Sequence, residues 1–154
     1  MVTFSLAAEM QAPVEHVFDT IVDLRGYGRW LDPSVDYSGT LEISTDPVAA
    51  GTTYVERSGV GVRRGTVTEL LAPFLVTFDQ SMTVRPKLFG VIDIQVTYSL
   101  TPSAVGVRLE RLVTVDLPWQ LIPAGPLVVA RFRKESERIV QALKAFVEGA
   151  SGPR

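Results

Sequence analysis

The chain has 154 residues, of which 46% are hydrophobic and 21% are charged, and its formal net charge is −2. This length suits one domain with a substantial core, and the small negative charge disfavours nucleic-acid binding, which normally requires a basic face. Cysteine is absent and histidine occurs once, which excludes disulfides, thiol catalysis, and metal sites built from thiolates or several histidines.

The N-terminal part predicts a strand followed by two short helices. Apolar residues alternate over residues 2–8, which is typical of a half-buried strand. Pro13 suits the first turn of a helix, and the apolar positions 14, 17, 18 and 21 follow helical spacing. A second short helical turn is expected to carry Tyr27 and Trp30.

The middle of the chain predicts a series of strands. Each predicted strand contains alternating apolar residues, and most are separated by short turns rich in glycine, proline or serine. The expected strands span residues 35–43, 52–57, 62–71, 74–82, 88–100 and 105–115. Short connections of this kind predict an antiparallel sheet.

The last part predicts one long amphipathic helix from Pro126 to Gly149. Apolar residues recur there at helical spacing, with charged residues on the opposite face. The apolar stripe consists of Val128, Phe132, Ile139, Leu143 and Phe146, widened by Val129, Val140 and Val147. A single helix after a β-rich middle must bury this stripe against the sheet. The predicted fold is therefore α+β, with a curved sheet that grips the helix and encloses a cavity.

We expect a single domain over residues 1–149 and a flexible tail over residues 150–154. The N-terminus has neither the positive charge nor the apolar core of a signal peptide. No apolar run approaches the roughly 20 residues that a membrane span requires. The expected location is the cytoplasm, without stable membrane insertion, as a monomer or a homodimer.

Several short stretches occur in an order that resembles a known superfamily. The stretches are APVEHVF at 12–18, DL at 23–24 before Tyr27, WL at 30–31, GTTY at 51–54, GTVTE at 65–69 before Pro73, and LKAFVEG at 143–149. This order resembles the START-like, Bet v 1-like superfamily (SRPBCC), and within it the bacterial polyketide cyclase/dehydrase and lipid-transport group. The resemblance covers nearly the whole chain.

The resemblance implies a helix-grip fold. In this fold a seven-stranded antiparallel sheet wraps around the C-terminal helix, with two short helices near the N-terminus and a cavity between sheet and helix. It implies no single activity, because members that resemble this chain include lipid and hormone carriers, polyketide cyclases and protein-binding domains. The superfamily has no universal catalytic motif, so no catalytic residue is carried over from it.

Arg111 is a charged residue at a position where the pattern predicts an apolar one. It shares the parity of Val107, Leu109 and Val113, on the side of the last strand that faces the helix. A charge there must be paired or must face a ligand. Arg111 could hold a carboxylate, phosphate or enolate oxygen, for which a guanidinium is well suited. The alternatives are a structural ion pair, or a register change that places Arg111 in solvent.

Glu56 is a candidate partner for Arg111. If Tyr54 faces inward, the period of two places Glu56 inward as well. A carboxyl group that faces an apolar cavity can act as a general acid or base, whereas an inward Glu56 near Arg111 would form an inert salt bridge. The other parity places Val55 and Arg57 inward and leaves Glu56 in water.

Aromatic residues complete the set of candidate site residues. Tyr98 lies on the apolar parity of its strand and could donate a hydrogen bond to a ligand oxygen, although an aromatic residue there can also serve the core alone. The predicted ligand contacts are Trp30, Tyr54, Glu56, Phe78, Tyr98, Arg111 and Phe132. The aromatic and methionine residues expected in the core or pocket wall are Phe74, Phe78, Met82, Phe89 and Trp119.

Three functions are compatible with the sequence. The first is binding of an apolar small molecule, such as a lipid, polyketide or isoprenoid-like compound, in the cavity. The second is a polyketide cyclase or dehydratase, with Arg111 stabilising an enolate and Glu56 or Tyr98 moving protons. The third is a protein-interaction module with a filled cavity. We expect neither a cofactor nor a metal.

Overall fold

The computed structural model describes residues 1–32, 39–45, 47–59, 61–84 and 87–151. One antiparallel sheet has the strand order β1-β7-β6-β5-β4-β3-β2. The strands are β1 (Val2–Met10), β2 (Gly39–Leu41), β3 (Thr53–Ser58), β4 (Gly61–Leu71), β5 (Leu75–Val84), β6 (Val91–Ser103) and β7 (Gly106–Asp116). The helices are α1 (Val14–Val22) and α2 (Gly125–Ser151), with 3₁₀ turns η1 (Leu24–Arg29), η2 (Lys87–Phe89) and η3 (Trp119–Ala124).

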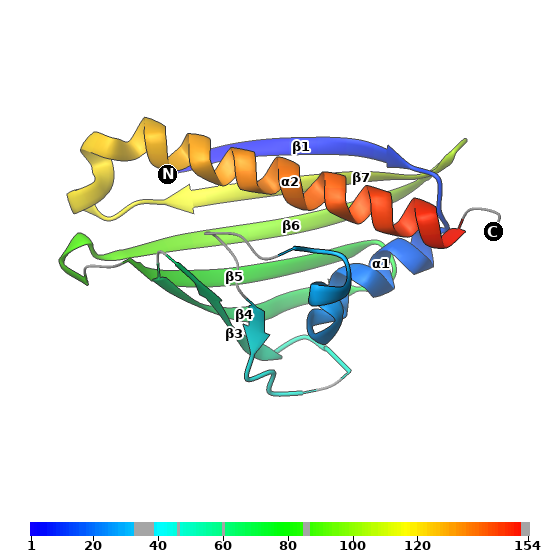
Figure 1. Ribbon diagram of the computed structural model, residues 1–154, viewed down its shortest axis with the longest axis horizontal. Helices are drawn as coiled ribbons and strands as arrows, with labels where there is room; N and C mark the ends of the chain where they lie inside the picture. The colour runs from blue at the N-terminus through cyan, green and yellow to red at the C-terminus, as the bar shows by residue number, and fades with distance from the viewer. Residues whose placement is uncertain (33–38, 46, 60, 85–86, 152–154) are drawn as a thin grey trace.

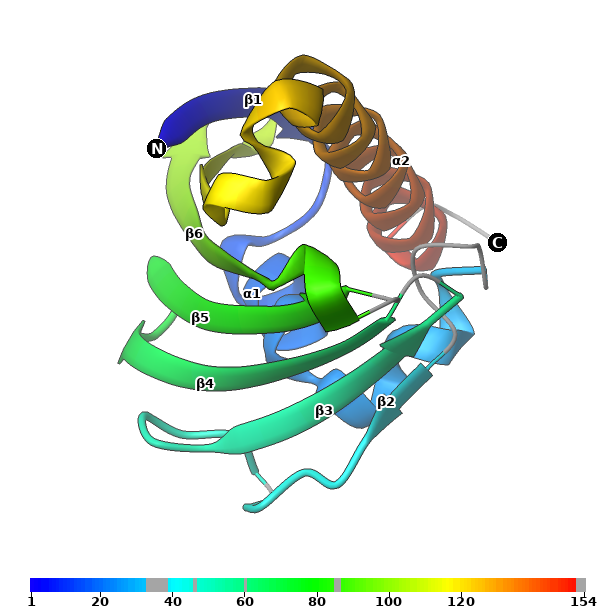
Figure 2. The same ribbon diagram turned by 90° about the vertical axis from the view of Figure 1, so that its left-hand side faces the viewer.

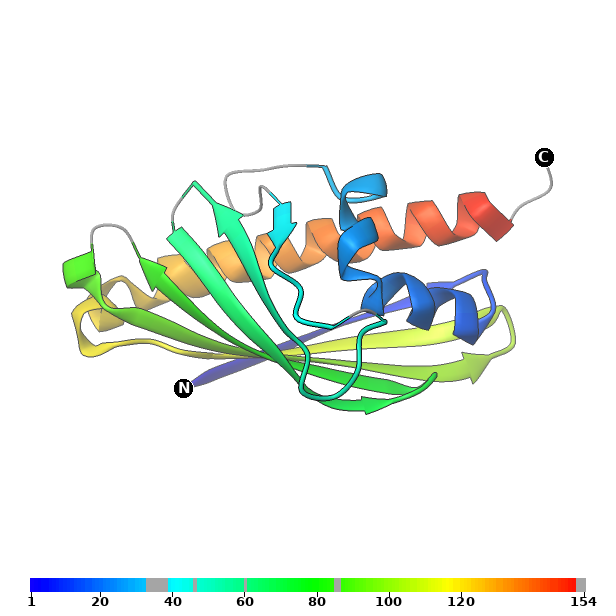
Figure 3. The ribbon, with the colours of Figure 1, turned by 90° about the horizontal axis from the view of Figure 1, so that it is seen from below.

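The sheet curls around the helices. The helix α2 runs along the length of the sheet (Figure 1), and the end-on view in Figure 2 shows the strands forming an arc whose open side α2 closes. Both α1 and α2 lie on the same, concave side of the sheet (Figure 3). The predicted seven-stranded helix-grip fold is therefore confirmed.

Several boundaries differ from the predicted ones by two or more residues. The strand β2 is short, and much of the segment predicted as its strand falls on residues 33–38, outside the described residues. The strand β6 begins at Val91, because Lys87–Phe89 forms a 3₁₀ turn and Gly90 takes a φ of 86°, which favours glycine. The helix α2 continues to Ser151, two residues beyond its predicted end.

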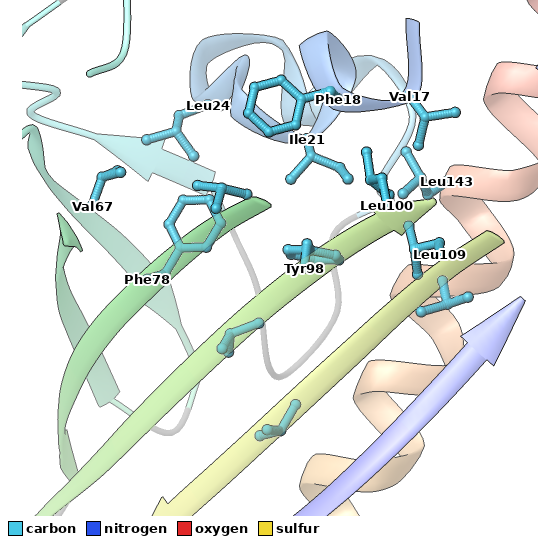
Figure 4. Close-up of a cluster of buried hydrophobic side chains, with 14 of the residues drawn as sticks. Val17, Phe18, Ile21, Leu24, Val67, Phe78, Tyr98, Leu100, Leu109 and Leu143 are labelled. Atoms are coloured by element: carbon cyan, nitrogen blue, oxygen red, sulfur yellow. The ribbon is translucent and has the colours of Figure 1, made fainter. Parts of the chain in front are cut away.

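The α1 end of the concave side is filled with apolar side chains. Val17, Phe18 and Ile21 are buried on the inner face of α1 and belong to one core cluster with Leu100 of β6 and Leu143 of α2 (Figure 4). Burying one such side chain stabilises the fold by about 1.5–3 kcal/mol. The packing beside α1 leaves space farther along the concave side, between η1 and η3.

The face that α2 presents to the sheet is rotated from the predicted stripe. Its most buried residues are Ser136, Val140, Leu143 and Val147, whereas the flanking apolar residues Phe132, Ile139 and Phe146 are only partly buried. The predicted stripe centred on these flanking residues is therefore shifted. Two of them, Phe132 and Ile139, border a hollow, which explains why their side chains are not fully covered.

Three of the aromatic residues expected in the core are exposed. Phe74, Phe89 and Trp119 have exposed fractions of 49%, 37% and 78%. They lie in the turn between β4 and β5, in η2 and in η3, which are connections at the ends of the sheet. The alternation of residues along a strand predicts which side chains face inward, but a turn has no such regular pattern. Phe78 and Met82, which lie on β5, are buried.

Candidate functional site

Two adjoining pockets lie between the concave face of the sheet and α2. The polar pocket has a volume of about 50 Å³ and contains charged groups and tyrosine hydroxyls. It is lined by Leu24, Tyr27, Leu31, Tyr54, Glu56, Arg63, Phe78, Gln80, Val96, Tyr98, Arg111, Glu135 and Ile139. The apolar pocket has a volume of about 170 Å³. It is lined by Arg63, Met82, Val84, Ile92, Leu121, Val128, Arg131, Phe132 and Glu135.

Arg111 reaches the polar pocket from β7. Its position lies directly across from Tyr98 in the β6–β7 register, and its Nη1 donates to the Tyr98 hydroxyl. Its Nε donates to the Ser136 hydroxyl of α2 at 3.2 Å, and the guanidinium carbon lies 5.2 Å from the centre of the Tyr98 ring. Among the described residues Arg111 has no carboxylate partner, so the structural ion pair considered for it is not observed.

Glu56 points inward, as the parity of Tyr54 predicts, and only 7% of it is exposed. Its partner is Arg63, whose Nη1 lies 3.0 Å from the Glu56 Oε2. Glu56 and Arg63 face each other directly in the β3–β4 register. The predicted pairing of Glu56 with Arg111 is therefore wrong, because the adjacent strand supplies a nearer guanidinium.

Two tyrosine hydroxyls stay protonated over a wide pH range. The Tyr27 hydroxyl donates to the Ile21 carbonyl at 2.5 Å, and the Tyr54 hydroxyl accepts from Gln80 Nε2 at 2.6 Å. Burial raises the pKa of both hydroxyls above the usual value of 10.0. The negative charge of Glu56 raises the Tyr54 pKa further. Both side chains therefore remain neutral near pH 7.

The structure brings five of the seven predicted contact residues to one pocket. Tyr54, Glu56, Phe78, Tyr98 and Arg111 all line the polar pocket. The rings of Tyr54 and Phe78 meet edge to face at a centroid distance of 6.0 Å, and those of Phe78 and Tyr98 at 6.2 Å. These aromatic contacts link β3, β5 and β6 across the floor of the pocket.

The other two predicted contact residues lie elsewhere. Phe132 lines the apolar pocket. Trp30 lines neither pocket; its ring lies 5.0 Å from that of Tyr27, and Tyr27 itself borders the polar pocket. Trp30 therefore contacts a residue of the polar pocket without lining the pocket itself. Its indole N–H is buried without a partner among the described residues.

Several residues of the site were not predicted from the sequence, although the sequence carries signals for them. Gln80 lies two residues from both Phe78 and Met82 and shares their inward parity on β5. Ser136 precedes Val140 by four residues and so lies on the same face of α2. Glu135, whose carboxylate lies 2.6 Å from Arg138 Nη2, is three residues after Phe132 and four before Ile139, so helical spacing places it on the predicted stripe.

The described residues contain no group of three or more histidine, cysteine, aspartate or glutamate side chains able to hold a metal ion. In the same part of the chain, no helix has both the length and the apolar composition required to cross a membrane.

Comparison with known proteins assigns the fold to a family. The model of the family described as polyketide cyclase / dehydrase and lipid transport matches residues 1–148. No curated protein matches the chain. Solved structures with a similar fold are known, and those described below have at most 24% identity to this chain.

Three solved structures illustrate this similarity. The Mll3558 protein from Rhizobium loti has 24% identity and a TM-score of 0.68, with 94% of this chain and 95% of that chain covered. The Aha1 dimer from Colwellia psychrerythraea has 16% identity and a TM-score of 0.68, with 99% and 100% covered. DynU16, from the dynemicin biosynthetic locus, has 20% identity and a TM-score of 0.66, with 95% and 47% covered. At these identities the likeness shows the fold alone.

Proposed function

This chain belongs to the polyketide cyclase/dehydrase and lipid transport family, and from this premise we propose that it binds an apolar small molecule between the sheet and α2. Lipids, polyketides and isoprenoid-like compounds are the candidate classes. The observation that carries the proposal is the apolar pocket, in which six of the nine lining side chains are apolar. Water in such a pocket finds few hydrogen-bond partners, so an apolar molecule that displaces it gains free energy.

The size of the apolar pocket limits the ligand. Its volume of about 170 Å³ is close to that of an engineered apolar cavity of about 150 Å³ that takes up benzene. It is smaller than the roughly 300–1,000 Å³ typical of sites for drug-sized ligands. A narrow chain or a single ring therefore fits without rearrangement of α2.

Native mass spectrometry of the purified protein tests this proposal. A mass higher than the denatured mass, by an amount that disappears on denaturation, would demonstrate a bound molecule and give its class. If the protein is purified bare, the same measurement after incubation with decanol should show one bound molecule. A protein that retains neither a co-purified molecule nor decanol would contradict the proposal.

A filling variant locates the binding site. Val128 lines the apolar pocket from α2, so Val128→Phe should occupy the space and reduce decanol binding by about tenfold or more, because the apolar contact area is lost. The neighbouring residue Leu127 is 78% exposed, and Leu127→Phe is the matched control that should bind as the unaltered protein does. Equal binding by both variants would place the ligand elsewhere.

A second candidate is an enzyme of the cyclase or dehydratase type. The polar pocket favours it, because Arg111, Tyr98 and Glu56 line the same small space. Arg111 could stabilise an enolate oxygen, and the Tyr98 hydroxyl could move a proton. Glu56 is less suited to a catalytic role than its inward position alone suggests, because its carboxylate is already paired with Arg63. Conversion of a bound poly-β-keto compound, lost in Arg111→Gln, would support this candidate.

A further inference from the structure

The two pockets adjoin along α2. Both are lined by Arg63 from β4 and by Glu135 from α2, so these two side chains stand where the pockets meet. Between Val128 in the apolar pocket and Ile139 in the polar pocket, α2 advances about 16 Å at a rise of about 1.5 Å per residue. The tyrosine hydroxyls and Arg111 line the pocket nearer η1.

The charges of the polar pocket leave one guanidinium without a carboxylate. Glu56 is paired with Arg63 at 3.0 Å, and Glu135 is paired with Arg138 at 2.6 Å. Both carboxylates that line the pocket therefore already have a cationic partner. Within the described residues, Arg111 contacts only the hydroxyls of Tyr98 and Ser136 and the Tyr98 ring.

Hydrogen-bond donors are also left over at this end. The two described bonds engage two of the five N–H donors of Arg111. The hydroxyls of Tyr54 and Tyr98 both accept in their described side-chain bonds, from Gln80 and Arg111, so each can still donate its own proton. An acceptor with two oxygens close together would use the Arg111 guanidinium and the Tyr98 hydroxyl at the same time.

We propose that the ligand is a monocarboxylic acid with a narrow apolar chain, whose carboxylate binds Arg111 and Tyr98 in the polar pocket and whose chain passes Arg63 and Glu135 into the apolar pocket. This inference rests on the proposed function and specifies the ligand for the same site. The single unmatched positive charge favours a monoanion. A phosphate monoester carries about −1.5 to −2 charges at pH 7, which Glu56 and Glu135 would repel.

Isothermal titration calorimetry with three probes of equal chain length tests the inference. The probes are decanoate, decanol and decyl phosphate, measured at pH 7.5 on the unaltered protein. Water solvates an ionised carboxylate better than a hydroxyl, so a pocket without an available cation would bind decanol more tightly. We expect decanoate to bind more tightly than both other probes.

The variant Arg111→Gln should weaken decanoate binding about tenfold or more and leave decanol binding nearly unchanged, because only the charged hydrogen bonds are removed. Arg108→Gln is the matched control, since Arg108 lies on the exposed face of the same strand with 54% of its side chain exposed. The control should bind decanoate as the unaltered protein does. Circular dichroism verifies that both variants fold.

The outcomes separate this inference from the proposed function. Decanol binding at least as tight as decanoate binding, or tighter binding of decyl phosphate, would contradict a carboxylate ligand. Neither result would contradict the proposed apolar binding site. Absence of binding by all three probes would contradict both. If Arg111→Gln does not fold, the ¹⁵N-edited spectrum of the unaltered protein decides: decanoate, but not decanol, should shift the Arg111 Nε–H resonance. An unmoved resonance would refute the inference.

Discussion

Glu56 shows how a charged residue is tolerated on the inner face of this sheet. Strand alternation turns its carboxylate inward, and the register of the β3–β4 pair places Arg63 directly opposite. Removing a buried carboxylate from water is costly unless a partner compensates it. At Arg111 the compensation is different, because two hydroxyls and an aromatic ring replace the carboxylate. The charged side chains of the polar pocket are thus each stabilised by a different set of partners.

The Glu56–Arg63 pair leads to a stability prediction. Arg63→Met leaves the Glu56 carboxylate buried without its partner and should lower the free energy of unfolding by about 3–5 kcal/mol. The double variant Glu56→Gln/Arg63→Met should recover most of this loss. Denaturant unfolding measures both changes. Arg64→Met, which alters an exposed residue on the other face of β4, should change stability little; an equal loss in Arg63→Met and Arg64→Met would show that the pair is dispensable.

Tyr54 predicts how stability changes at alkaline pH. Its pKa in the folded state is raised above the 10.0 of the unfolded chain, mainly by burial and then by Glu56. Above pH 10 the unfolded state loses this proton while the folded state retains it, so the free energy of unfolding must fall as pH rises. In Tyr54→Phe the fall between pH 9.5 and 11 should be shallower. Urea unfolding across this range measures the change in the free energy of unfolding with pH. Identical changes in Tyr54→Phe and the unaltered protein would contradict the raised pKa.

At the scale of elements, α2 determines both the packing and the hollow. Its C-terminal half packs closely, with Val140, Leu143 and Val147 buried. Lys144 Nζ also donates to the Glu9 carbonyl of β1 at 2.7 Å. Its N-terminal half borders the apolar pocket through Val128 and Phe132. One half of this helix therefore packs in the core, and the other half borders the apolar pocket.

This division predicts unequal effects of substitutions along α2. Leu143 is fully buried, so Leu143→Ala should lower the free energy of unfolding by about 2–5 kcal/mol through lost contacts and a new cavity. Gln141 is exposed on the same half of the helix, and Gln141→Ala is the control that should change stability little. Thermal unfolding compares them; a loss in Leu143→Ala no larger than that of the control would show that this half does not anchor the helix.

Much of this architecture could be predicted from the sequence, because strands and helices have fixed periods. Alternation predicts an inward Tyr98, whereas for Tyr54 and Glu56 the sequence leaves two parities open, of which the structure shows the inward one. Partners could not be predicted in the same way, because pairing depends on register and on which helix crosses a strand. The hairpin register could have paired Glu56 with Arg63, whereas the contact between Arg111 and Ser136 joins β7 to a helix 25 residues later.

The exposed Trp119 marks a further limit of sequence reasoning. A tryptophan is expected in a core on average, but Trp119 lies in the short turn η3 at the end of the sheet and is 78% exposed. Composition cannot distinguish such a connection from an inward strand position. The sequence alone also could not show whether side chains fill the space between the sheet and α2, because a few large side chains on α1 and α2 decide this.

At the scale of the whole molecule, the space between the sheet and α2 is filled with side chains beside α1 and contains pockets farther along. The α1 end holds a continuous apolar cluster (Figure 4), while the apolar pocket lies near η3 and the polar pocket lies between it and η1. A protein-interaction module with a filled cavity is harder to reconcile with this arrangement than a binding protein. Native mass measurement would also decide between the monomer and the homodimer expected from the sequence.

Methyl-resolved NMR during titration with decanol tests the central claim most directly, because it reports where an apolar molecule binds. The account predicts that the methyl resonances of Ile92, Leu121 and Val128, which line the apolar pocket, shift progressively. The methyl resonances of Val17 and Leu109, in the filled core, should remain in place. Shifts confined to exposed residues such as Ile122, or no shifts at all, would contradict binding between the sheet and α2.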